Sequence, residues 1–302
     1  MTEENSNRPR MVAWMLVILP LWLLVSGAAS VWYFLQREKQ QELATQQRFA
    51  RSVSESSLAD DLGKIVGIIG ERHVSSADAA KNLTRAAAMI EGSLGPANTG
   101  FDVLRVRGPA DWPLLHVVLA GTTPDLPAVW VLCSYDSRPG SPGVEENATG
   151  MAAVLAAAQT MADEKPRRAV HFVFVPHTND PASPVLETAA LLTKMIGSPS
   201  AILCIEAMGA GEVLWLSSRD TAAAPLELAQ GLGMVRGAEV VCIGDDADLA
   251  SVLFEMGLPA VRVATRPQIT EQEADNTLPP SAVLAASAGR LVELIRRCGN
   301  MP

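Results

Sequence analysis

Three segments, SYDS at residues 134–137, GVEENATG at residues 143–150 and HFVFVPHTN at residues 171–179, indicate how this chain folds. Short apolar runs at about 128–134 and 169–175 are typical of buried strands, and the stretch at about 147–164 has helical spacing. Strands that alternate with helices predict a partly parallel sheet. All three segments then lie at the carboxyl ends of parallel strands, where ligands usually bind in such sheets.

The same alternation extends outward from these segments. Ser75 to Asp78 offer a start for a helix at about 79–94, and Gly95 offers a stop. The pattern predicts an α/β fold, a three-layer αβα sandwich whose mixed, mostly parallel central sheet has about eight strands and begins with an antiparallel hairpin. The remaining strands are expected at about 101–107, 114–120, 201–206, 212–217, 239–243 and 259–264, and the remaining helices at about 182–196, 222–235, 246–256 and 281–297.

An uncharged segment precedes this domain. Residues 11–35 carry no charge and exceed the roughly 20 residues that cross a bilayer. Trp32, Tyr33 and Arg37 at its end are typical of a membrane interface. We therefore predict one N-terminal transmembrane helix that is retained as an anchor. The small residues at 26–30 leave a cleaved signal peptide open, although the apolar run continues beyond them.

The span divides the chain into four parts: an N-terminal tail (1–10), the transmembrane helix (11–35), a polar stalk or linker (36–60) and one folded domain (61–302). The net charge of −9 and the pI near 5.0 argue against a nucleic-acid partner, because affinity for phosphates comes mainly from clustered Lys and Arg. No pair of cysteines has metal-site spacing, so Cys133, Cys204, Cys242 and Cys298 are interpreted as small core residues.

The three segments resemble motifs of the co-catalytic di-zinc aminopeptidases, a family that includes leucyl aminopeptidase, aminopeptidase Y and glutaminyl cyclase-like enzymes. Their strands end in H-x-D-S, (D/N)-D-N-x-S-G and F-x-F-x-x-x-E-E. AILCIEAMG at residues 201–209 and DNTLPP at residues 275–280 are similar to two later motifs of the family. The resemblance covers about residues 60–300 and implies an extracytoplasmic domain. Positive residues after the span favour the cytoplasm instead, so the orientation stays open.

The resemblance implies a site in which most ligands are replaced. A di-zinc aminopeptidase needs two imidazoles, several carboxylates and a Glu base. The first His ligand falls on Ser134 and the last near Ile269 or Thr270, while the base and an adjacent Glu ligand fall on Thr178 and Asn179. None of these residues supplies an imidazole or a carboxylate.

Three carboxylates remain at the positions that the resemblance marks. Asp136 is retained, Glu146 falls on the bridging Asp, and Glu206 falls on another Asp ligand. Glu carries its carboxylate about 1.5 Å farther out than Asp, whereas metal–ligand distances tolerate about 0.2 Å. Such an oxygen-only set suits calcium or magnesium better than zinc. The alternative is that these acids only form hydrogen bonds to loops.

Two further positions have competing interpretations. Glu145 and Glu146 are candidate binding residues, but carboxylates in the first turn of a helix are also stabilised by its dipole. His177 is a candidate replacement ligand, but a lone loop histidine is more often a surface residue. His171, at the start of a strand, is a weaker candidate.

The sequence therefore predicts a membrane-anchored aminopeptidase-like domain that is catalytically inactive, needs no cofactor, and binds a peptide or partner protein or serves in a membrane complex. The alternative is a metal-dependent aminopeptidase or other hydrolase whose carboxylates hold zinc or another divalent cation. The candidate binding residues are Asp136, Glu145, Glu146, His177 and Glu206.

Overall fold

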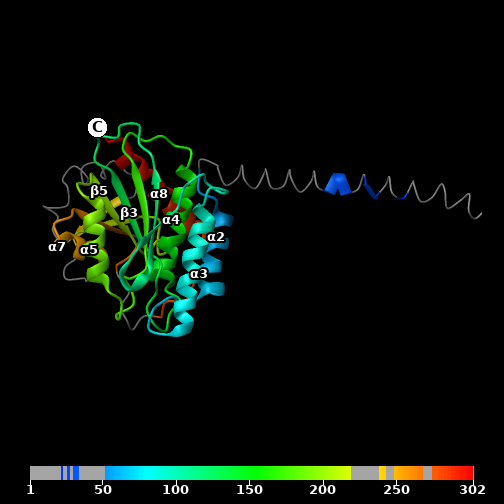
Figure 1. Ribbon diagram of the computed structural model, residues 1–302, viewed down its shortest axis with the longest axis horizontal. Coiled ribbons are helices and arrows are strands. Elements are labelled where there is room, and N and C mark those ends of the chain that lie inside the picture. The colour runs from blue at the N-terminus through cyan, green and yellow to red at the C-terminus, as the bar shows by residue number, and fades with distance from the viewer. Residues whose placement is uncertain are drawn as a thin grey trace, which may run out of the picture. The chain divides into compact units, whose positions relative to one another are not determined.

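The computed structural model describes residues 52–218, 238–242, 248–267 and 274–301, with residues 22, 26, 27 and 30–33 near the N-terminus. Most of the expected transmembrane helix, the expected helix at 222–235, and Ile269 with Thr270 lie outside the described residues. Within the described residues, none of the helices has the length and apolar character that a membrane span requires. Residues 1–47 and 48–302 form separate units, and the second is the folded domain (Figure 1).

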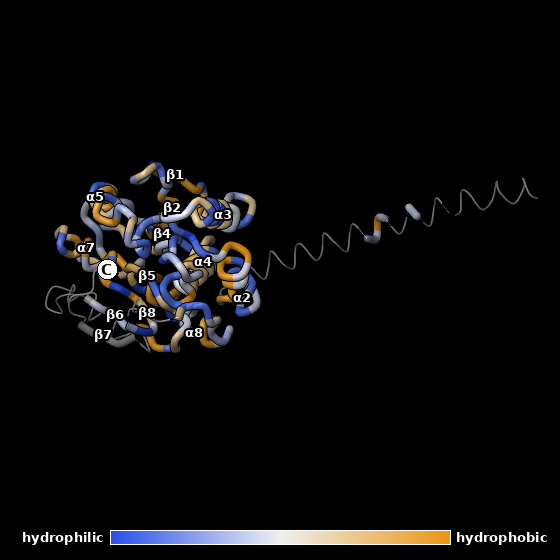
Figure 2. Tube along the Cα trace, turned by 90° about the horizontal axis from the view of Figure 1, so that it is seen from below, coloured by the Kyte–Doolittle hydropathy of each residue, from blue (hydrophilic) through white to orange (hydrophobic). Residues whose placement is uncertain are grey.

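A mixed sheet of eight strands forms the middle of the domain, in the order β1-β2-β4-β3-β5-β8-β6-β7 (Figure 2). The central strands β4, β3, β5 and β8 run parallel, whereas the β1–β2, β2–β4 and β6–β8 pairs are antiparallel. The prediction of an α/β fold with a mixed sheet that begins in a hairpin is confirmed. The strands are β1 (Leu104–Arg107), β2 (Pro113–Leu119), β3 (Val129–Ser134), β4 (Val170–Val175), β5 (Ala201–Ile205), β6 (Leu214–Ser218), β7 (Ala238–Cys242) and β8 (Ala260–Ala264).

Helices cover both faces of the sheet. Figure 1 shows α5 and α7 on one side of β3 and β5, and α2, α3, α4 and α8 on the other. Ser76 caps α3 by accepting a hydrogen bond from the Ala79 N–H, as the sequence indicates. The helices are α2 (Glu55–Gly63), α3 (Ala77–Leu94), α4 (Thr149–Met161), α5 (Val185–Ile196), α7 (Leu249–Glu255) and α8 (Ser281–Asn300), with shorter turns η1 (Lys64–Ile69), η2 (Pro109–Asp111) and η3 (Val144–Ala148).

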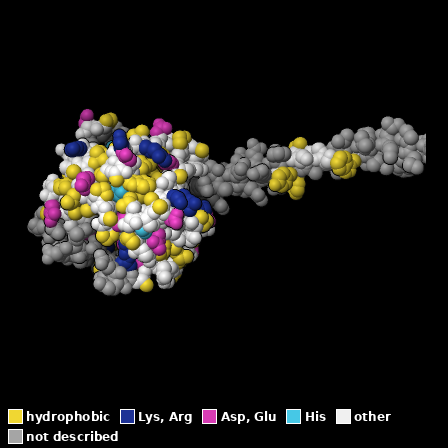
Figure 3. Space-filling model, turned by 60° about the horizontal axis from the view of Figure 1, so that its bottom comes forward, with side chains coloured by type: hydrophobic (Ala, Val, Ile, Leu, Met, Phe, Trp, Pro, Cys, Tyr) yellow, Lys and Arg dark blue, Asp and Glu magenta, His cyan; other side chains and the backbone are white. Residues whose placement is uncertain are grey.

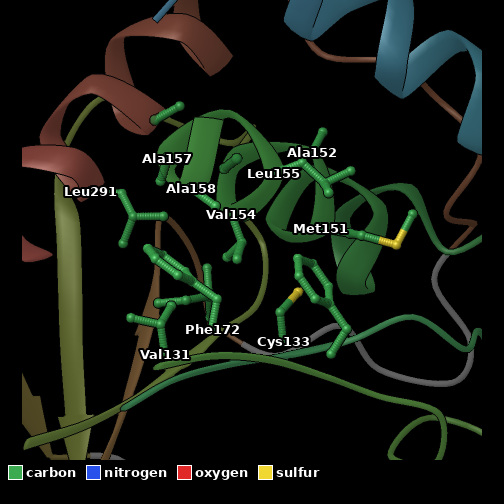
Figure 4. Packing of buried hydrophobic residues seen from close by; sticks show 14 of the residues in the cluster. Val131, Cys133, Met151, Ala152, Val154, Leu155, Ala157, Ala158, Phe172 and Leu291 are labelled. Atoms are coloured by element: carbon green, nitrogen blue, oxygen red, sulfur yellow. The ribbon is translucent and has the colours of Figure 1, made fainter. Parts of the chain in front are cut away.

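Helix α4 lies at the centre of the larger core. Most of its side chains are buried, because strands lie below it and other helices lie around it. Val131 and Phe172 of the sheet and Leu291 of α8 pack against it, and its alanines let these neighbours approach closely (Figure 4). This packing fixes the position of η3, the turn that leads into α4 and carries Glu145 and Glu146.

The folded domain begins earlier than residue 61. Helix α2 includes residues 55–60, which the sequence analysis assigned to a polar stalk or linker, and Leu58 is buried in the core. The assignment was wrong for these residues because Leu58 and Leu62 are four residues apart and face the core as a pair. Ser54 caps the helix by accepting a hydrogen bond from the Ser57 N–H.

Gly150 lets α4 approach the end of β5. A Cβ atom at this position would overlap the backbone carbonyl of Glu206. Gly289 of α8 differs, because a Cβ atom there would have no neighbour within 4 Å.

We expect Gly150→Ala to lower the free energy of unfolding by about 1–3 kcal/mol, because the new methyl group must displace backbone. The matched change Gly289→Ala should raise it by about 0.5–1 kcal/mol, since alanine is the better helix former. Urea denaturation of both variants measures the difference. Equal effects of the two changes would contradict the close approach of α4 and β5.

Candidate functional site

The residues that the resemblance marks lie at the carboxyl ends of β3, β4 and β5. Ser134 ends β3 and Asp136 follows it, Thr178 and Asn179 follow β4, and Glu206 follows β5. These strands are parallel neighbours, so their ends meet at one edge of the sheet. The segments after these strands therefore lie together, as the sequence predicts. Their side-chain contacts determine which ligands this edge can bind.

Asp136 holds the loop after β4 in place. Its carboxylate is fully buried and accepts hydrogen bonds from the backbone N–H groups of Thr178, Asn179 and Asp180 at 3.0, 2.8 and 3.1 Å. Burial raises the pKa of Asp136, and these three N–H groups offset part of the rise. Asp136 therefore acts as a structural acceptor for the loop that carries the family's base position.

Ser134 and Asn179, two positions of lost metal ligands, contact each other directly. The Asn179 side-chain amide donates to Ser134 Oγ at 2.9 Å and to Asp136 Oδ1 at 3.1 Å. Asn147 Nδ2 lies 3.4 Å from the same hydroxyl. An amide nitrogen that donates two hydrogen bonds has no lone pair for a metal ion. This pair is thus committed to hydrogen bonds within the protein.

Asp180 has a separate structural role. Its carboxylate accepts hydrogen bonds from the Val74 N–H at 3.0 Å and from Ser75 Oγ at 2.9 Å. It therefore fastens the loop after β4 to the segment that precedes α3. Because these contacts hold its carboxylate, Asp180 does not take the place of the family's catalytic Glu base.

Glu146 is mostly buried in η3. Its Oε2 accepts a hydrogen bond from the Arg138 N–H at 3.1 Å, and the Arg138 guanidinium lies 4.0 Å away. Burial raises the pKa of Glu146 to about 7, and the negative charges of Asp136 and Asp275 add to the rise. Glu146, which stands at the family's bridging-ligand position, therefore faces hydrogen-bond donors of Arg138.

Glu145 has a less favourable environment. Both carboxylate oxygens are buried, and none of the described residues gives either one a hydrogen bond of ordinary geometry. Burial raises the pKa of Glu145 to about 7, although the nearby N–H of Gly209 offsets part of the shift. A Cβ atom at position 209 would overlap the Glu145 carboxylate and the Pro279 ring, so a larger residue there would displace these side chains.

Asp275 caps the turn that holds both glutamates. Its two carboxylate oxygens accept hydrogen bonds from the N–H groups of Glu145 and Glu146 at 2.7 and 2.9 Å. The two glutamates are in the first turn that leads into α4, as one of the two interpretations expected. Their backbone contacts, more than a helix dipole, fix this turn.

Glu206 forms an ion pair with Arg262 of β8. Arg262 is 1% exposed, and its Nε also lies 4.0 Å from the carboxylate of Asp248. Asp248 caps α7 by accepting a hydrogen bond from the Ser251 N–H at 2.6 Å.

A second arginine, Arg72, is buried beside this edge. Its guanidinium donates to the backbone carbonyls of Tyr135, Gly70 and Pro142 at 2.9, 2.6 and 3.0 Å, and to Asn147 Oδ1 at 2.8 Å. Burial lowers the pKa of Arg72 to about 10, opposed by the negative charge of Asp136 among others. Arg72 therefore joins the segment before α3 to the loops after β3.

The histidines differ from the sequence expectations. His177 was interpreted as either a ligand or a surface residue, but it is 1% exposed and its Nε2 lies 3.4 Å from the Pro109 carbonyl. The surface interpretation is wrong, because the loop after β4 folds inward onto Asp136. Burial lowers the pKa of His177. His171 instead stacks on Trp130, with ring centroids 4.1 Å apart, and forms a 2.9 Å hydrogen bond with His116.

The sequence analysis missed the contacts of Arg72, Arg262 and Asp275. Arg262 had a visible signal, since a charged residue in the apolar strand AVRVA requires a buried partner. Asp275 was noted as part of a preserved motif, but its partners are 130 residues away in sequence.

The side chains present do not fit a zinc site. Within the described part of the chain, no three His, Cys, Asp or Glu side chains are grouped so that they could hold a metal ion. The carboxylates of Asp136 and Glu206 are occupied by backbone N–H groups and by Arg262, respectively. Structural and catalytic zinc sites usually include imidazole or thiolate ligands, and His177, the one imidazole described in these loops, is not grouped with two further ligands.

The structure is an α/β domain whose candidate site lies at the carboxyl ends of parallel strands. The family model described as Peptidase family M28 matches residues 115–177, from β2 to the end of β4. This match, with the fold, confirms the resemblance to zinc aminopeptidases and glutaminyl cyclases. No protein of curated function matches the sequence significantly.

Solved structures with this fold include aminopeptidases and glutaminyl cyclases. The LapA aminopeptidase of Legionella pneumophila has a TM-score of 0.63 and 12% identity over 88% of this chain and 75% of its own. A glutaminyl cyclase of Tannerella forsythia has a TM-score of 0.63 and 12% identity over 81% and 99%. BSAP, a zinc aminopeptidase from Bacillus subtilis, has a TM-score of 0.63 and 8% identity over 82% and 95%. Identities this low establish the fold alone.

We expect Asp136→Asn to lower the free energy of unfolding by about 2–3 kcal/mol, because the amide NH2 replaces one of two oxygens that accept hydrogen bonds and leaves buried donors without an acceptor. Asp125→Asn, at an exposed turn, is the control and should change it by less than about 0.5 kcal/mol. Chemical denaturation compares the two variants. A loss no larger than that of the control would show that Asp136 does not hold the loop.

Glu145 and Glu146 should make stability depend on pH. Their folded-state pKa of about 7 lies above the ordinary value of 4.5, so the protonated forms favour folding. That contribution is fully present below about pH 4.5 and is lost as pH rises through about 7. Buried His116, His171 and His177 have lowered pKa values and act in the opposite direction.

A double variant separates these opposing effects. Glu145→Gln/Glu146→Gln keeps the histidines but removes the two titrations, so its stability relative to the unsubstituted protein should increase from about pH 4.5 to 7 and then level off. Urea denaturation at half-unit pH intervals gives the difference. A difference that does not vary with pH would rule out the raised pKa values.

Proposed function

We propose that this chain is a membrane-anchored domain with the aminopeptidase fold that does not catalyse zinc-dependent hydrolysis and that binds a peptide or partner protein at the carboxyl edge of its sheet. The observation that carries this proposal is the contact between Asn179 and Ser134, reinforced by Asp136. Ser134 stands at a metal-ligand position of the family, and Asn179 stands next to the base position. A hydrogen bond joins the two side chains where catalysis needs an open metal site.

The absence of a base supports the inactive interpretation. Thr178 and Asn179 stand at the family's two Glu positions, and their backbone N–H groups are held by Asp136. His177 is buried behind the same loop, and burial keeps its imidazole neutral at pH 7. A general base must reach the attacking water and accept its proton, and neither Thr nor Asn can do so at neutral pH.

The proposed partner is a peptide or protein. The strand-end edge of an α/β sheet is where such folds present ligands, and here it is built from loops of four strands. The face in Figure 3 has Lys and Arg side chains interspersed with Asp and Glu, which supports a protein partner over a nucleic acid. A structural role as a subunit of a membrane complex would use the same surface.

The anchor belongs to this proposal as well. The uncharged run at residues 11–35 supports a single membrane span, and the family resemblance supports an extracytoplasmic domain. A membrane anchor would keep such a binding domain close to other membrane proteins. Extraction of the full chain by detergent but not by alkaline carbonate would be the expected behaviour of such an anchor.

The test combines metal content, turnover and binding in the full chain, solubilised in mild detergent. We expect far less than one zinc per chain, no aminopeptidase turnover with added zinc, and selection of binding peptides from a random library. Stoichiometric metal with turnover abolished by Glu146→Gln would overturn the proposal in favour of a metal-dependent hydrolase with a carboxylate site. Absence of any selected peptide or co-purified protein would remove its binding half.

A further inference from the structure

Arg262 has an unusual position for a charged residue. It lies in β8, an interior strand between β5 and β6, and its neighbours Val261 and Val263 are buried. A charge in such an environment is stable only if opposite charges and hydrogen bonds surround it. The groups that surround this guanidinium therefore indicate its role at the carboxyl edge of the sheet.

Acidic and carbonyl groups from three different segments surround Arg262. Its Nε contacts the carboxylate of Glu206, which follows β5, and lies 4.0 Å from Asp248 at the start of α7. Its Nη1 donates to the carbonyl of Arg266 at 3.1 Å. A cation thus draws together the end of β5, the start of α7 and the loop after β8.

Collecting oxygen ligands from several strand ends is also what a bound metal ion does in such a fold. The family resemblance places a metal-ligating carboxylate at Glu206, and in this chain that carboxylate is paired with the guanidinium of Arg262. A longer Glu side chain extends farther from the backbone than Asp, and here it reaches Arg262.

We infer that Arg262 is a built-in cation that replaces a bound metal ion at this edge. The inference rests on the proposed function, because the Glu206 oxygen that pairs with the guanidinium is not open to a catalytic metal ion. Arg72 has a different role, since its donors go to backbone carbonyls and to Asn147. The domain is therefore stable without metal, and its acidic edge is closed to added divalent cations.

The first experiment measures thermal unfolding of the full chain in detergent. The unsubstituted protein should show the same Tm, within about 1 °C, with a chelator, zinc, magnesium or calcium. Arg262→Ala should unfold several degrees lower, because Glu206 and Asp248 lose their cation. Millimolar methylguanidinium should raise the Tm of Arg262→Ala and leave the unsubstituted protein unchanged.

Two further variants separate lost charge from lost packing. Arg262→Met/Glu206→Met removes the charge pair but keeps its volume, and should recover most of the lost Tm. Arg290→Ala removes an arginine from a more exposed pair with Glu212 at 3.2 Å and should leave the Tm nearly unchanged. If Arg262→Ala does not fold, the Tm of the double variant and the metal response of the unsubstituted protein still decide the question.

Four results would overturn the inference: a stable Arg262→Ala variant, no increase in the Tm of that variant with methylguanidinium, a double variant no more stable than Arg262→Ala, or a large Tm increase of the unsubstituted protein with a divalent cation. Turnover reports on the proposed function separately. An inactive protein whose Arg262→Ala variant ignores methylguanidinium would disprove the built-in cation and leave the proposed function standing, whereas zinc-dependent turnover would disprove the proposed function itself.

Discussion

Every carboxylate buried at the carboxyl edge of this sheet needs a hydrogen-bond donor or a positive charge, and that requirement organises the region. Backbone N–H groups serve Asp136 and Asp275, and arginine side chains serve Glu146 and Glu206. In a metallopeptidase, metal ions would meet much of this requirement. Here the protein's own groups serve these four carboxylates, whereas Glu145 has no ordinary hydrogen bond from the described residues and its pKa is raised to about 7.

This solution also explains why the fold tolerates such extensive change at one edge. The core depends on α4 and on the strands beneath it, and burial of these apolar side chains provides most of the driving force for folding. Polar substitutions at the edge alter chemistry without disturbing that core. Function can therefore change while the architecture stays recognisable.

Much of the architecture could be predicted because it follows from local sequence. The cap at Ser76, the apolar runs of the strands and the periodicity of α8 each depend on residues close together in the chain. The contacts of Arg72 and Arg262 could not be predicted in the same way. Their partners come from segments up to 75 residues distant, and only the folded sheet brings these together. The burial of His177 escaped prediction for the same reason, since it depends on how one loop turns.

The link from Asp275 to η3 bears on the order in which the chain folds. Asp275 binds the N–H groups of two residues about 130 positions earlier, and α8 packs against α4. Contacts between residues so far apart in sequence form slowly, because closing the long intervening loop costs conformational entropy before the contact can stabilise it. During synthesis, η3 cannot form its contacts with Asp275 until that residue has been made. Glu145 and Glu146 remain hydrated until then. The edge that defines this domain is therefore among the last parts to form, and a truncation that removes α8 would leave the N-terminal strands without a finished site.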